Sequence, residues 1–453
     1  MKVKKAQEYF KDKKVLQMGL GLLGRGVGDA RFVAKSQPKS FTVTDLKSAE
    51  DLESSLEELK DFNINFVLGE HNLQDFKDAD VVLKSAGVPL ESEYIKAARD
   101  AGAQVLMSAA VATKYAQDLG MTTIGVTGTR GKSTTAQMIY DALKKYRKDA
   151  NVFLGGNIKG VSTLEMSEQF KEGDILVLEL DSWQLQGFGD LKISPNVAVF
   201  TNFYPDHQNY YGSMEKYFSD KANIFKYQSW DRADLLVVSD EIYDLISAQN
   251  PPVEPMEASR IPEEWSLKVP GTHMRANAAL ALEVLSQMGL SMPEIKEALE
   301  DFSGVPGRLE YLKEYSEGFG FDIYNDNNAT SPEATVAAID ALSQNKKEGQ
   351  RLILIVGGSD KGLDLEKLSE AINEKVDKVF LYDGTGSQKL EKMLNEYEKS
   401  DSFSEIVTKA LKEAKKGDIL LFSPAFASFG KEFKNEYDRE ERFLETLQNF
   451  QKA

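Results

Sequence analysis

Short apolar runs alternate along this chain with glycine or polar turns and with longer stretches of helical periodicity. Apolar runs bounded by turn residues are typical of buried strands, and the stretches between them are typical of amphipathic helices. Strands that alternate with helices predict parallel sheets covered by helices, the doubly wound α/β class. The first series of predicted strands is carried by KVLQMGLG, SFTVTDL, INFVLG and DADVVLKSAGVPL.

Two further series of the same kind follow. The second begins with QVLMSAA and TTIGVTGTRGKS, continues through DILVLELDS and PNVAVFTNFYPDH, and ends in the helical GTHMRANAALALEVLSQMG. The third contains FDIYNDNNATSP, RLILIVGGSDKG, DKVFLYDGTG and GDILLFSPAFASFG. The pattern predicts three α/β domains, at residues 1–105, 106–304 and 305–453. Ligands of such sheets bind beyond the carboxyl ends of the strands, so we expect the three sets of strand-end loops to face a common cleft.

The composition excludes several classes of protein. The 453 residues include 42% hydrophobic and 28% charged residues, an ordinary globular balance. A net charge of −17 disfavours general binding to nucleic acid or to anionic membranes. The absence of cysteine excludes disulfides, thiolate metal sites and a thioester on the enzyme. No run approaches the roughly 20 apolar residues of a membrane span, so we expect a soluble cytoplasmic protein.

The stretch GVTGTRGKSTT, residues 125–135, has the composition of a phosphate-binding loop between a strand and a helix. Glycines allow close approach, and the N–H groups at a helix start bind anions. Lys132 would reach the terminal phosphates, and Ser133 or Thr134 would bind Mg²⁺. Five residues rather than four separate Gly125 from Gly131, and a chance glycine turn is the alternative. The remaining loop residues in this interpretation are Gly128, Thr129 and Arg130.

A second glycine loop, MGLGLLGRGVG, follows the first predicted strand. Gly19, Gly21 and Gly24 have the spacing of a dinucleotide-binding turn, and Asp45 ends the next strand, where it could bind a ribose hydroxyl. A nicotinamide cofactor, a nucleotide-diphosphate ligand and glycines that only allow close packing all fit this pattern.

Two further strand ends carry candidate chemistry. Glu179 ends the apolar run of LVLELDSWQLQ, where a carboxylate is costly unless it is paired or metal-bound, so it is a candidate Mg²⁺ ligand. A solvated strand end is the alternative. His207 follows Pro205 and Asp206 in a strand-end loop and is either a site residue or a structural histidine. Lys221 lies in a helix-like stretch, and its spacing alone does not distinguish it from a surface lysine.

Taken together, the ordered motifs resemble the Mur ligase family over essentially the whole chain. The motifs are MGLGLLGRG, KSAGVPL, GVTGTRGKST, GGNI, LELDSWQL, NFYPDH, SMEKYFSDKANIF, GTHMRANAAL, GVPGRLE, NDNNATSPEAT, GGSDKG and SPAFASF. The resemblance implies an N-terminal Rossmann-like domain that binds a UDP-sugar, a central P-loop ATPase domain, and a C-terminal Rossmann-like domain that completes the ATP and glutamate sites.

The resemblance also implies roles for individual residues. The UDP-substrate positions are Gly21, Leu22, Leu23, Asp45, Lys47, Gly87 and Asn157, and the phosphate and Mg²⁺ positions are Lys132, Ser133, Thr134, Glu179 and His207. Lys221 falls on a lysine that the family carbamylates, which would turn a cation into a carboxylate-like Mg²⁺ ligand. Asn277, Arg308 and Asp326 match contacts to the ATP base and ribose, and Thr330, Lys361 and Ser428 match contacts to the glutamate carboxylates.

The implied activity is ATP-dependent amide formation between UDP-N-acetylmuramoyl-L-alanine and D-glutamate through an acyl phosphate, with two Mg²⁺ ions and a monomeric enzyme. L-Glutamate as substrate, a neighbouring ligase step, a non-catalytic nucleotide-binding regulator and a nucleic-acid motor are the alternatives. Three positions depart from the family pattern: Met274 and Asn328, where asparagine and lysine occur in other members, and Glu440, within a lengthened FGKEFKNEYDREERF, where glycine is usual.

Overall fold

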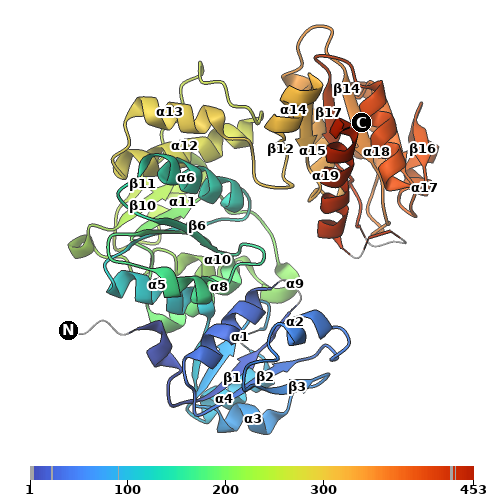
Figure 1. Cartoon of the computed structure of the whole chain (residues 1–453). Helices are drawn as coiled ribbons and strands as arrows, with labels where there is room; N and C mark the ends of the chain where they lie inside the picture. The colour runs from blue at the N-terminus through green and yellow to red at the C-terminus, as the bar shows by residue number, and fades with distance from the viewer. Residues whose placement is uncertain (1–4, 22–23, 90, 429–431, 434, 453) are drawn as a thin grey trace. The chain divides into compact units, whose positions relative to one another are not determined.

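Three mainly parallel sheets, each flanked by helices, are built from the apolar runs (Figure 1). A computed structural model describes residues 5–21, 24–89, 91–428, 432–433 and 435–452. The chain divides into two compact units, one formed by Met1–Ile261 with Ala276–Ala298 and the other by Pro262–Arg275 with Leu299–Ala453. The first two sheets belong to the first unit, and the third sheet belongs to the second unit.

The first sheet has the strand order β3-β2-β1-β4-β5, and all its pairs are parallel. Its order reverses beside β1, and such a switch point places a ligand-binding crevice at the carboxyl ends of the neighbouring strands. The strands are β1 (Lys14–Met18), β2 (Ser40–Asp45), β3 (Asn65–Leu68), β4 (Val81–Lys84) and β5 (Gln104–Leu106). The helices are α1 (Arg25–Lys35), α2 (Glu53–Glu57), α3 (Leu73–Asp78) and α4 (Glu93–Asp100).

One strand was assigned to the wrong series from the sequence. The run QVLMSAA was expected to begin the second sheet, whereas β5 pairs in parallel with β4 at the edge of the first sheet. An apolar run shows that a segment is buried, but it contains no information about the strand with which that segment pairs. The second series therefore begins with α5 (Ser108–Asp118), which leads into β6 (Thr122–Thr127).

The second sheet is fully parallel and has the order β11-β10-β9-β6-β8-β7. Figure 1 shows α6, α12 and α13 on one side of this sheet and α5, α8 and α10 on the other. The remaining strands are β7 (Val152–Gly156), β8 (Ile175–Glu179), β9 (Val197–Phe200), β10 (Leu235–Val238) and β11 (Pro255–Glu257). The helices are α6 (Lys132–Tyr146), α7 (Thr163–Met166), α8 (Ser182–Leu191), α9 (Gln208–Tyr211), α10 (Met214–Ala222), α11 (Tyr243–Ser247), α12 (Thr272–Gln287) and α13 (Met292–Asp301).

The third sheet has the order β12-β13-β17-β14-β15-β16, and only the short edge pair β12–β13 is antiparallel. Its strands are β12 (Glu310–Tyr311), β13 (Asp322–Asn325), β14 (Leu352–Val356), β15 (Lys378–Tyr382), β16 (Glu398–Ser400) and β17 (Ile419–Phe422). Its helices are α14 (Lys313–Phe319), α15 (Pro332–Gln344), α16 (Glu366–Lys375), α17 (Ser387–Leu390), α18 (Phe403–Glu413) and α19 (Glu436–Lys452).

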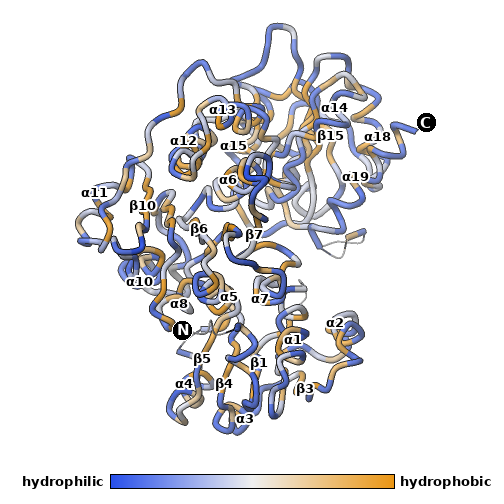
Figure 2. The backbone as a smooth tube through the Cα atoms, turned by 60° about the vertical axis from the view of Figure 1, so that its left-hand side comes forward, coloured by the Kyte–Doolittle hydropathy of each residue, from blue (hydrophilic) through white to orange (hydrophobic). Residues whose placement is uncertain are grey.

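The central strands are buried on both faces, because helices cover both sides of the sheets. Every residue of β8, β9, β14 and β17 is buried, and Figure 2 shows apolar residues concentrated along the strands. The candidate catalytic and binding side chains therefore lie at or beyond the ends of the strands. Within the described part of the chain, no helix is long and apolar enough to cross a membrane.

Candidate active site

The phosphate loop lies at the centre of the second sheet. It connects β6, which ends at Thr127, to α6, which begins at Lys132. Gly128 and Gly131 have φ values of +147° and +81°, which favour glycine. A Cβ atom at Gly128 would lie 1.9 Å from Thr201 Oγ1, and one at Gly131 would lie 2.4 Å from Asn277 Oδ1. The strand–turn–helix context expected for this stretch is confirmed, and the close approach of neighbouring chain segments requires its glycines.

Two lysine amines meet on the backbone of this loop. Lys132 Nζ donates to the carbonyl oxygens of Gly128 and Thr129 at 3.1 and 2.9 Å. Lys221 Nζ, which comes from α10, donates to the same Gly128 oxygen at 2.7 Å. The tertiary structure thus brings together, at one carbonyl of the loop, two lysines that lie 89 positions apart in the numbering of the chain.

Lys221 is almost completely buried, with 1% of its surface exposed. Its ammonium lies 4.9 Å from the centroid of the Tyr217 ring and 3.5 Å from Thr127 Oγ1. Burial, followed by the nearby positive charge of Lys132, lowers the pKa of Lys221 well below its usual value, and Asp181 and Asp206 oppose this change. A buried amine of this kind spends more of its time neutral than a surface lysine does.

Glu179 lies on one side of the phosphate loop. It ends β8 and is paired in register with Val126 of β6, so its strand end is adjacent to the start of the loop. Its side chain is 5% exposed, and its Oε1 accepts a hydrogen bond from Asn157 Nδ2 at 3.5 Å. The main-chain N–H of Asn157 also donates to the Glu179 carbonyl at 2.7 Å. The structure therefore brings the predicted muramoyl contact, Asn157, next to the predicted metal ligand.

His207 lies on the other side of the loop, because it follows β9, which pairs with the opposite edge of β6. Its φ is +51°, an uncommon value for a residue with a side chain. Its backbone N–H donates to Asp206 Oδ1 at 2.8 Å, and its ring lies 4.6 Å from that of Trp183. The main chain of His207 is thus fixed within its own loop, and its ring packs against an aromatic neighbour.

The residues around the loop suit Mg²⁺ bound jointly with phosphate. No group of three or more His, Asp or Glu side chains that could hold a metal ion is found among the described residues. Mg²⁺ is commonly held by one or two protein oxygens together with substrate phosphates and water. The Ser133 and Thr134 hydroxyls in the first turn of α6 and the Glu179 carboxylate at the next strand end are a donor set of that type.

The first glycine loop is held by Asp45. Its Oδ2 accepts hydrogen bonds from the N–H groups of Leu20 and Gly21 at 2.8 and 3.1 Å, and its Oδ1 accepts one from Lys47 N–H at 2.9 Å. Burial by itself would raise the pKa of Asp45, but these backbone hydrogen bonds lower it below its usual value. The carboxylate therefore organises the loop itself. The predicted contacts Leu22 and Leu23 lie outside the described residues.

Replacing Asp45 with alanine should destabilise the first unit. Three backbone donors would lose a charged acceptor, which costs on the order of 1–3 kcal/mol. Because the pKa of Asp45 is lowered in the folded protein, this stabilisation is present above the unfolded-state pKa and is lost as pH falls through the lower folded-state value. Thermal unfolding at neutral pH should show a lower unfolding temperature for Asp45→Ala than for wild type, and this difference should shrink in acid.

Replacing the exposed Asp61 with alanine is the matched control. An equal shift of the unfolding temperature in both variants would contradict the role of Asp45 in holding the glycine loop.

A cavity lies between the first glycine loop and the second sheet, within the first unit. Three of the predicted UDP-substrate residues line it: Gly21, Lys47 and Gly87. The second sheet contributes Gly156, which ends β7, and the segment after this strand contributes Thr163, which begins α7. The full lining consists of Leu20, Gly21, Arg25, Gly26, Asp29, Lys47, Lys84, Ser85, Ala86, Gly87, Met107, Ser108, Ala109, Gly156, Val161, Thr163 and Gln184.

In the second unit, the predicted glutamate contacts lie in loops that follow three neighbouring strands. Thr330, Lys361 and Ser428 follow β13, β14 and β17, respectively, and β17 lies between the other two. Lys361 Nζ donates to the Thr330 carbonyl at 3.1 Å. Ser359 and Ala427 exchange backbone hydrogen bonds at 3.0 and 3.2 Å, which joins the loops that carry Lys361 and Ser428.

The predicted ATP contacts have different environments. Asn277 is buried against the phosphate loop at Gly131, whereas Arg308 is exposed in the second unit. Asp326 is buried, and its two oxygens accept hydrogen bonds from Leu309 N–H at 2.9 Å and the Ser423 hydroxyl at 2.8 Å. Burial raises the pKa of Asp326 to about 7, against the effect of these hydrogen bonds.

The three departures from the family pattern have local explanations. Met274 is buried in α12, where an apolar side chain is accommodated. Asn328 Nδ2 donates to the Pro306 carbonyl at 3.3 Å. Glu440 Oε1 accepts a hydrogen bond from Asn325 Nδ2 at 2.8 Å, so this carboxylate has a defined partner beside the third sheet. Residues 429–431 and 434 of the lengthened stretch lie outside the described residues.

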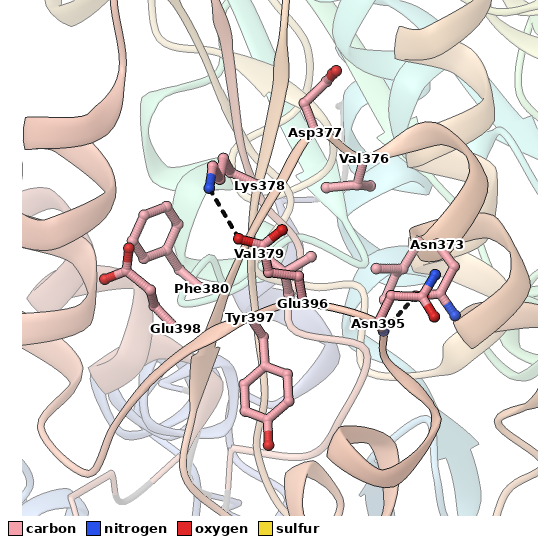
Figure 3. A pocket seen from close by; sticks show the side chains of 11 residues that line it. Asn373, Val376, Asp377, Lys378, Val379, Phe380, Asn395, Glu396, Tyr397 and Glu398 are labelled. Carbon is pink, nitrogen blue, oxygen red and sulfur yellow. Dashed lines mark hydrogen bonds and ion pairs between the residues drawn. The ribbon is translucent and has the colours of Figure 1, made fainter.

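Two pockets of the second unit differ in their relation to these residues. The pocket in Figure 3 lies at the amino ends of β15 and β16, where Lys378 pairs with Glu396 at 3.3 Å, and none of the predicted site residues lines it. Parallel α/β sheets bind ligands at the other end of their strands, so this pocket is not part of the candidate site. A second pocket, at the carboxyl ends, is lined by Ser428, Ser359 and Arg439.

Sequence reasoning missed four buried or half-buried ionisable residues near the candidate sites. Arg439 is 1% exposed and donates to both the side-chain and main-chain oxygens of Asn327 at 2.8 Å, which ties α19 to the loop after β13. Arg25, Asp29 and Lys84 line the cavity of the first unit. Lys84 alone had a sequence signal, as a cation at the end of an apolar strand. The others lie on amphipathic helices, where charged residues are ordinarily solvated.

Comparison with known proteins supports one family along the whole chain. Three family models match: the Mur ligase MurD-like N-terminal domain at residues 13–107, the Mur ligase middle domain at 126–261, and the glutamate ligase domain of Mur ligases at 307–426. This chain belongs to the Mur ligase family. The predicted three-domain Mur ligase fold is confirmed, and the match to the middle domain covers the phosphate loop, Glu179, His207 and Lys221.

Two relatives of this Mur ligase share a name. A UDP-N-acetylmuramoylalanine–D-glutamate ligase of Roseiflexus sp. (strain RS-1) is 34% identical over 97% of this chain and 99% of the relative. A protein of the same name from Ligilactobacillus salivarius is 30% identical over 93% of both chains. Solved structures share the fold: a UDP-N-acetylmuramate–alanine ligase of Thermotoga maritima has a TM-score of 0.58 at 20% identity, with 96% and 99% of the two chains covered. A MurF ligase from the same organism in complex with ADP has a TM-score of 0.53 at 20% identity, with 91% and 95% covered.

Proposed function

We propose that this chain is the UDP-N-acetylmuramoyl-L-alanine–D-glutamate ligase of peptidoglycan precursor synthesis, and that it uses ATP to form the amide bond. The relatives at 30–34% identity over nearly their full length have this activity in their names. The observation that carries the mechanism is the pair of lysines, Lys132 and Lys221, on the backbone of the phosphate loop. A simple nucleotide-binding regulator has no need of a second, buried amine at that place.

The reaction proceeds in two group transfers. The terminal carboxylate of UDP-N-acetylmuramoyl-L-alanine attacks the γ-phosphorus of ATP, the bond to the bridging oxygen breaks, and ADP leaves with that electron pair. The amine of D-glutamate then attacks the carbonyl carbon of the acyl phosphate, loses a proton, and expels inorganic phosphate. Neither step needs a nucleophile from the protein, in agreement with the absence of cysteine.

The chain's own residues position the reactants and neutralise their charge. Lys132 and the N–H groups at the start of α6 would hold the transferred phosphoryl group. Ser133 or Thr134, Glu179 and His207 are the protein groups proposed to hold two Mg²⁺ ions, which would offset the negative charge on the phosphates. Asn157, held between Glu179 and Arg25, would orient the muramoyl-alanine end of the substrate.

Lys221 is proposed to act as a carbamate. Its neutral amine attacks carbon dioxide, an N–C bond forms, and one proton is released, which leaves an anionic oxygen pair where an ammonium had been. The burial and the neighbouring Lys132 that lower the pKa of Lys221 favour the neutral amine that this reaction needs. The anionic product would be a Mg²⁺ ligand of the kind that this ion prefers.

The remaining assignments follow the family pattern. Gly21, Leu22, Leu23, Asp45, Lys47 and Gly87 are proposed contacts to the UDP part, and Asn277, Arg308 and Asp326 to the adenosine part of ATP. Thr330, Lys361 and Ser428 are proposed to bind the glutamate carboxylates, which suit an ammonium and hydroxyls. The enzyme is proposed to act as a monomer in the cytoplasm on small molecules, without a nucleic-acid or membrane partner.

Phosphate release from ATP tests this function directly. The assay contains UDP-N-acetylmuramoyl-L-alanine and D-glutamate, L-glutamate or no amino acid, and mass spectrometry identifies the product. We expect release that depends on D-glutamate and a UDP-linked dipeptide product. Dependence on L-glutamate would retain the mechanism and change the substrate, because an ammonium and hydroxyls can hold either enantiomer. Release that is independent of both amino acids would refute the ligase assignment.

A further inference from the structure

The helix that follows the first glycine loop begins with an arginine. Gly24 precedes α1 with φ of +80°, and Arg25 is the first helical residue. Arg25 is half-buried and lines the cavity between this loop and the second sheet, together with Gly21 and Gly26. No sequence motif singled it out, and the family assignments above give it no role.

The guanidinium of Arg25 is held from the side of the second sheet. Its Nη1 donates to Asn157 Oδ1 at 2.9 Å, and this is its one hydrogen bond within the described part of the chain. A guanidinium has five N–H donors in a planar fork, so most of them are left for another acceptor. Because Asn157 Nδ2 is directed to Glu179, the asparagine oxygen is the end that fixes Arg25.

The cavity has a positive lining on an otherwise acidic protein. Arg25, Lys47 and Lys84 line it, and Asp29 is the single carboxylate among the described lining residues. The ammonium of Lys84 is occupied, because it donates to the carbonyls of Ser85, Ala86 and Val88 at 3.2, 3.4 and 2.5 Å. Lys47 is exposed at the rim. Arg25 is therefore the one of these three cations that is both fixed in position and has N–H donors available for a ligand.

The companion acid supports this arrangement. Asp29 lies one turn after Arg25 on α1, and its Oδ1 accepts a hydrogen bond from Ser162 at 2.6 Å. The carboxylate of Asp29 is attracted by the charge of Arg25 and repelled by that of Glu165. Asp29 thus secures the inner face of α1 to the segment before α7, and Arg25 is presented at the helix N-terminus, where backbone N–H groups and the helix dipole also favour an anion.

We propose that Arg25 is a substrate-binding residue that contacts the diphosphate of the UDP-sugar, and that it determines the preference for a nucleoside diphosphate over a monophosphate. The identity of the full ligand rests on the proposed function, whereas the diphosphate contact rests on the cavity. A planar fork that meets two adjacent phosphates forms more charged hydrogen bonds than a lysine in the same place.

Calorimetric binding of UDP and UMP to the full chain, without ATP or glutamate, tests the proposal. We expect wild type to prefer UDP, Arg25→Ala to lose about 10- to 100-fold in UDP affinity with little change for UMP, and Arg25→Lys to recover part of the loss. Lys35→Ala, at the exposed end of the same helix, is the matched control and should bind both nucleotides as wild type does. Thermal unfolding checks that each variant is folded, and Arg25→Gln substitutes for Arg25→Ala if the latter is not.

The outcomes separate this proposal from the ligase assignment. An unchanged preference for UDP over UMP in the arginine variants, or no such preference in wild type, would overturn the role of Arg25 even if the ligase assay succeeds. A lost preference in a protein without ligase activity would retain Arg25 as a diphosphate contact and refute the proposed function. In the active enzyme, Arg25→Ala should raise KM for the UDP-sugar and leave KM for ATP and D-glutamate unchanged.

Discussion

Replacement of Lys132 with alanine is expected to lower kcat for D-glutamate-dependent phosphate release by about 100- to 1,000-fold, the usual effect of removing one group that stabilises transition-state charge. The ammonium lies on the phosphate loop, within 3.1 Å of the Gly128 carbonyl and 2.9 Å of the Thr129 carbonyl. Its loss would leave the charge on the transferred phosphoryl group without one of the cations proposed to neutralise it. The measurement is steady-state phosphate release at saturating substrates.

The matched control for this variant lies on the same helix. Lys144 is exposed near the end of α6 and donates to the Tyr140 hydroxyl, so Lys144→Ala removes the same charge from α6 without touching the loop. It should retain the wild-type rate. If Lys132→Ala released phosphate as fast as Lys144→Ala, the proposed role of Lys132 in neutralising the transferred phosphoryl group would be refuted.

Replacement of Lys221 with methionine is expected to lower kcat by at least about 100-fold. Loss of a residue that only orients a metal ligand lowers activity by about 10- to 100-fold, and the carbamate of Lys221 is proposed to be a ligand itself. Methionine is unbranched and close in length to the apolar stem of lysine, and the site is 1% exposed, so the variant should fill the same space and remain folded. It cannot form a carbamate. A short carboxylic acid such as formate should partly restore the rate in Lys221→Ala, because it can supply the missing anionic oxygens in the space left by the side chain.

The carbamate itself can be detected independently of turnover. Native mass spectrometry of wild type in bicarbonate buffer should show the added mass of one carbon dioxide, which disappears after treatment with acid, and Lys221→Met should lack it. Because burial lowers the pKa of Lys221, the adduct should form at a pH where exposed lysines are protonated and unreactive. Lys216→Met, from the exposed face of the same helix, is the control. A fully active Lys221→Met enzyme would refute a catalytic role for this residue.

The parts of the fold that could be predicted depend on local chemistry. The turn at residues 128–131 needs glycine because its backbone has positive φ and its neighbours leave no room for Cβ, and such a constraint is visible in the sequence. The same is true of the first glycine loop and of the apolar strands. The membership of β5 in the first sheet was predicted wrongly, because the pairing of an edge strand depends on distant segments.

The candidate site could be predicted where a motif carries its own chemistry, as for Lys132 and Ser133. Asp45 was expected to meet a ribose, and that stays a prediction, but its hydrogen bonds to three backbone N–H groups could not be inferred from spacing. Arg25 and Asp29 could not be recognised at all. They lie on an amphipathic helix, and only the tertiary structure shows that Asp29 meets Ser162 and that Arg25 meets Asn157.

The sequence by itself determined the alternation of strands and helices, the two glycine loops and the family, because backbone conformation and burial impose constraints on each segment separately. Only the tertiary structure decided that Lys221 reaches the Gly128 carbonyl, that Asn157 stands between Arg25 and Glu179, and that three cations line one cavity. These relations join residues that are far apart in the chain. Their burial and electrostatic environment, and hence the lowered pKa of Lys221, exist only once the sheets and helices have packed.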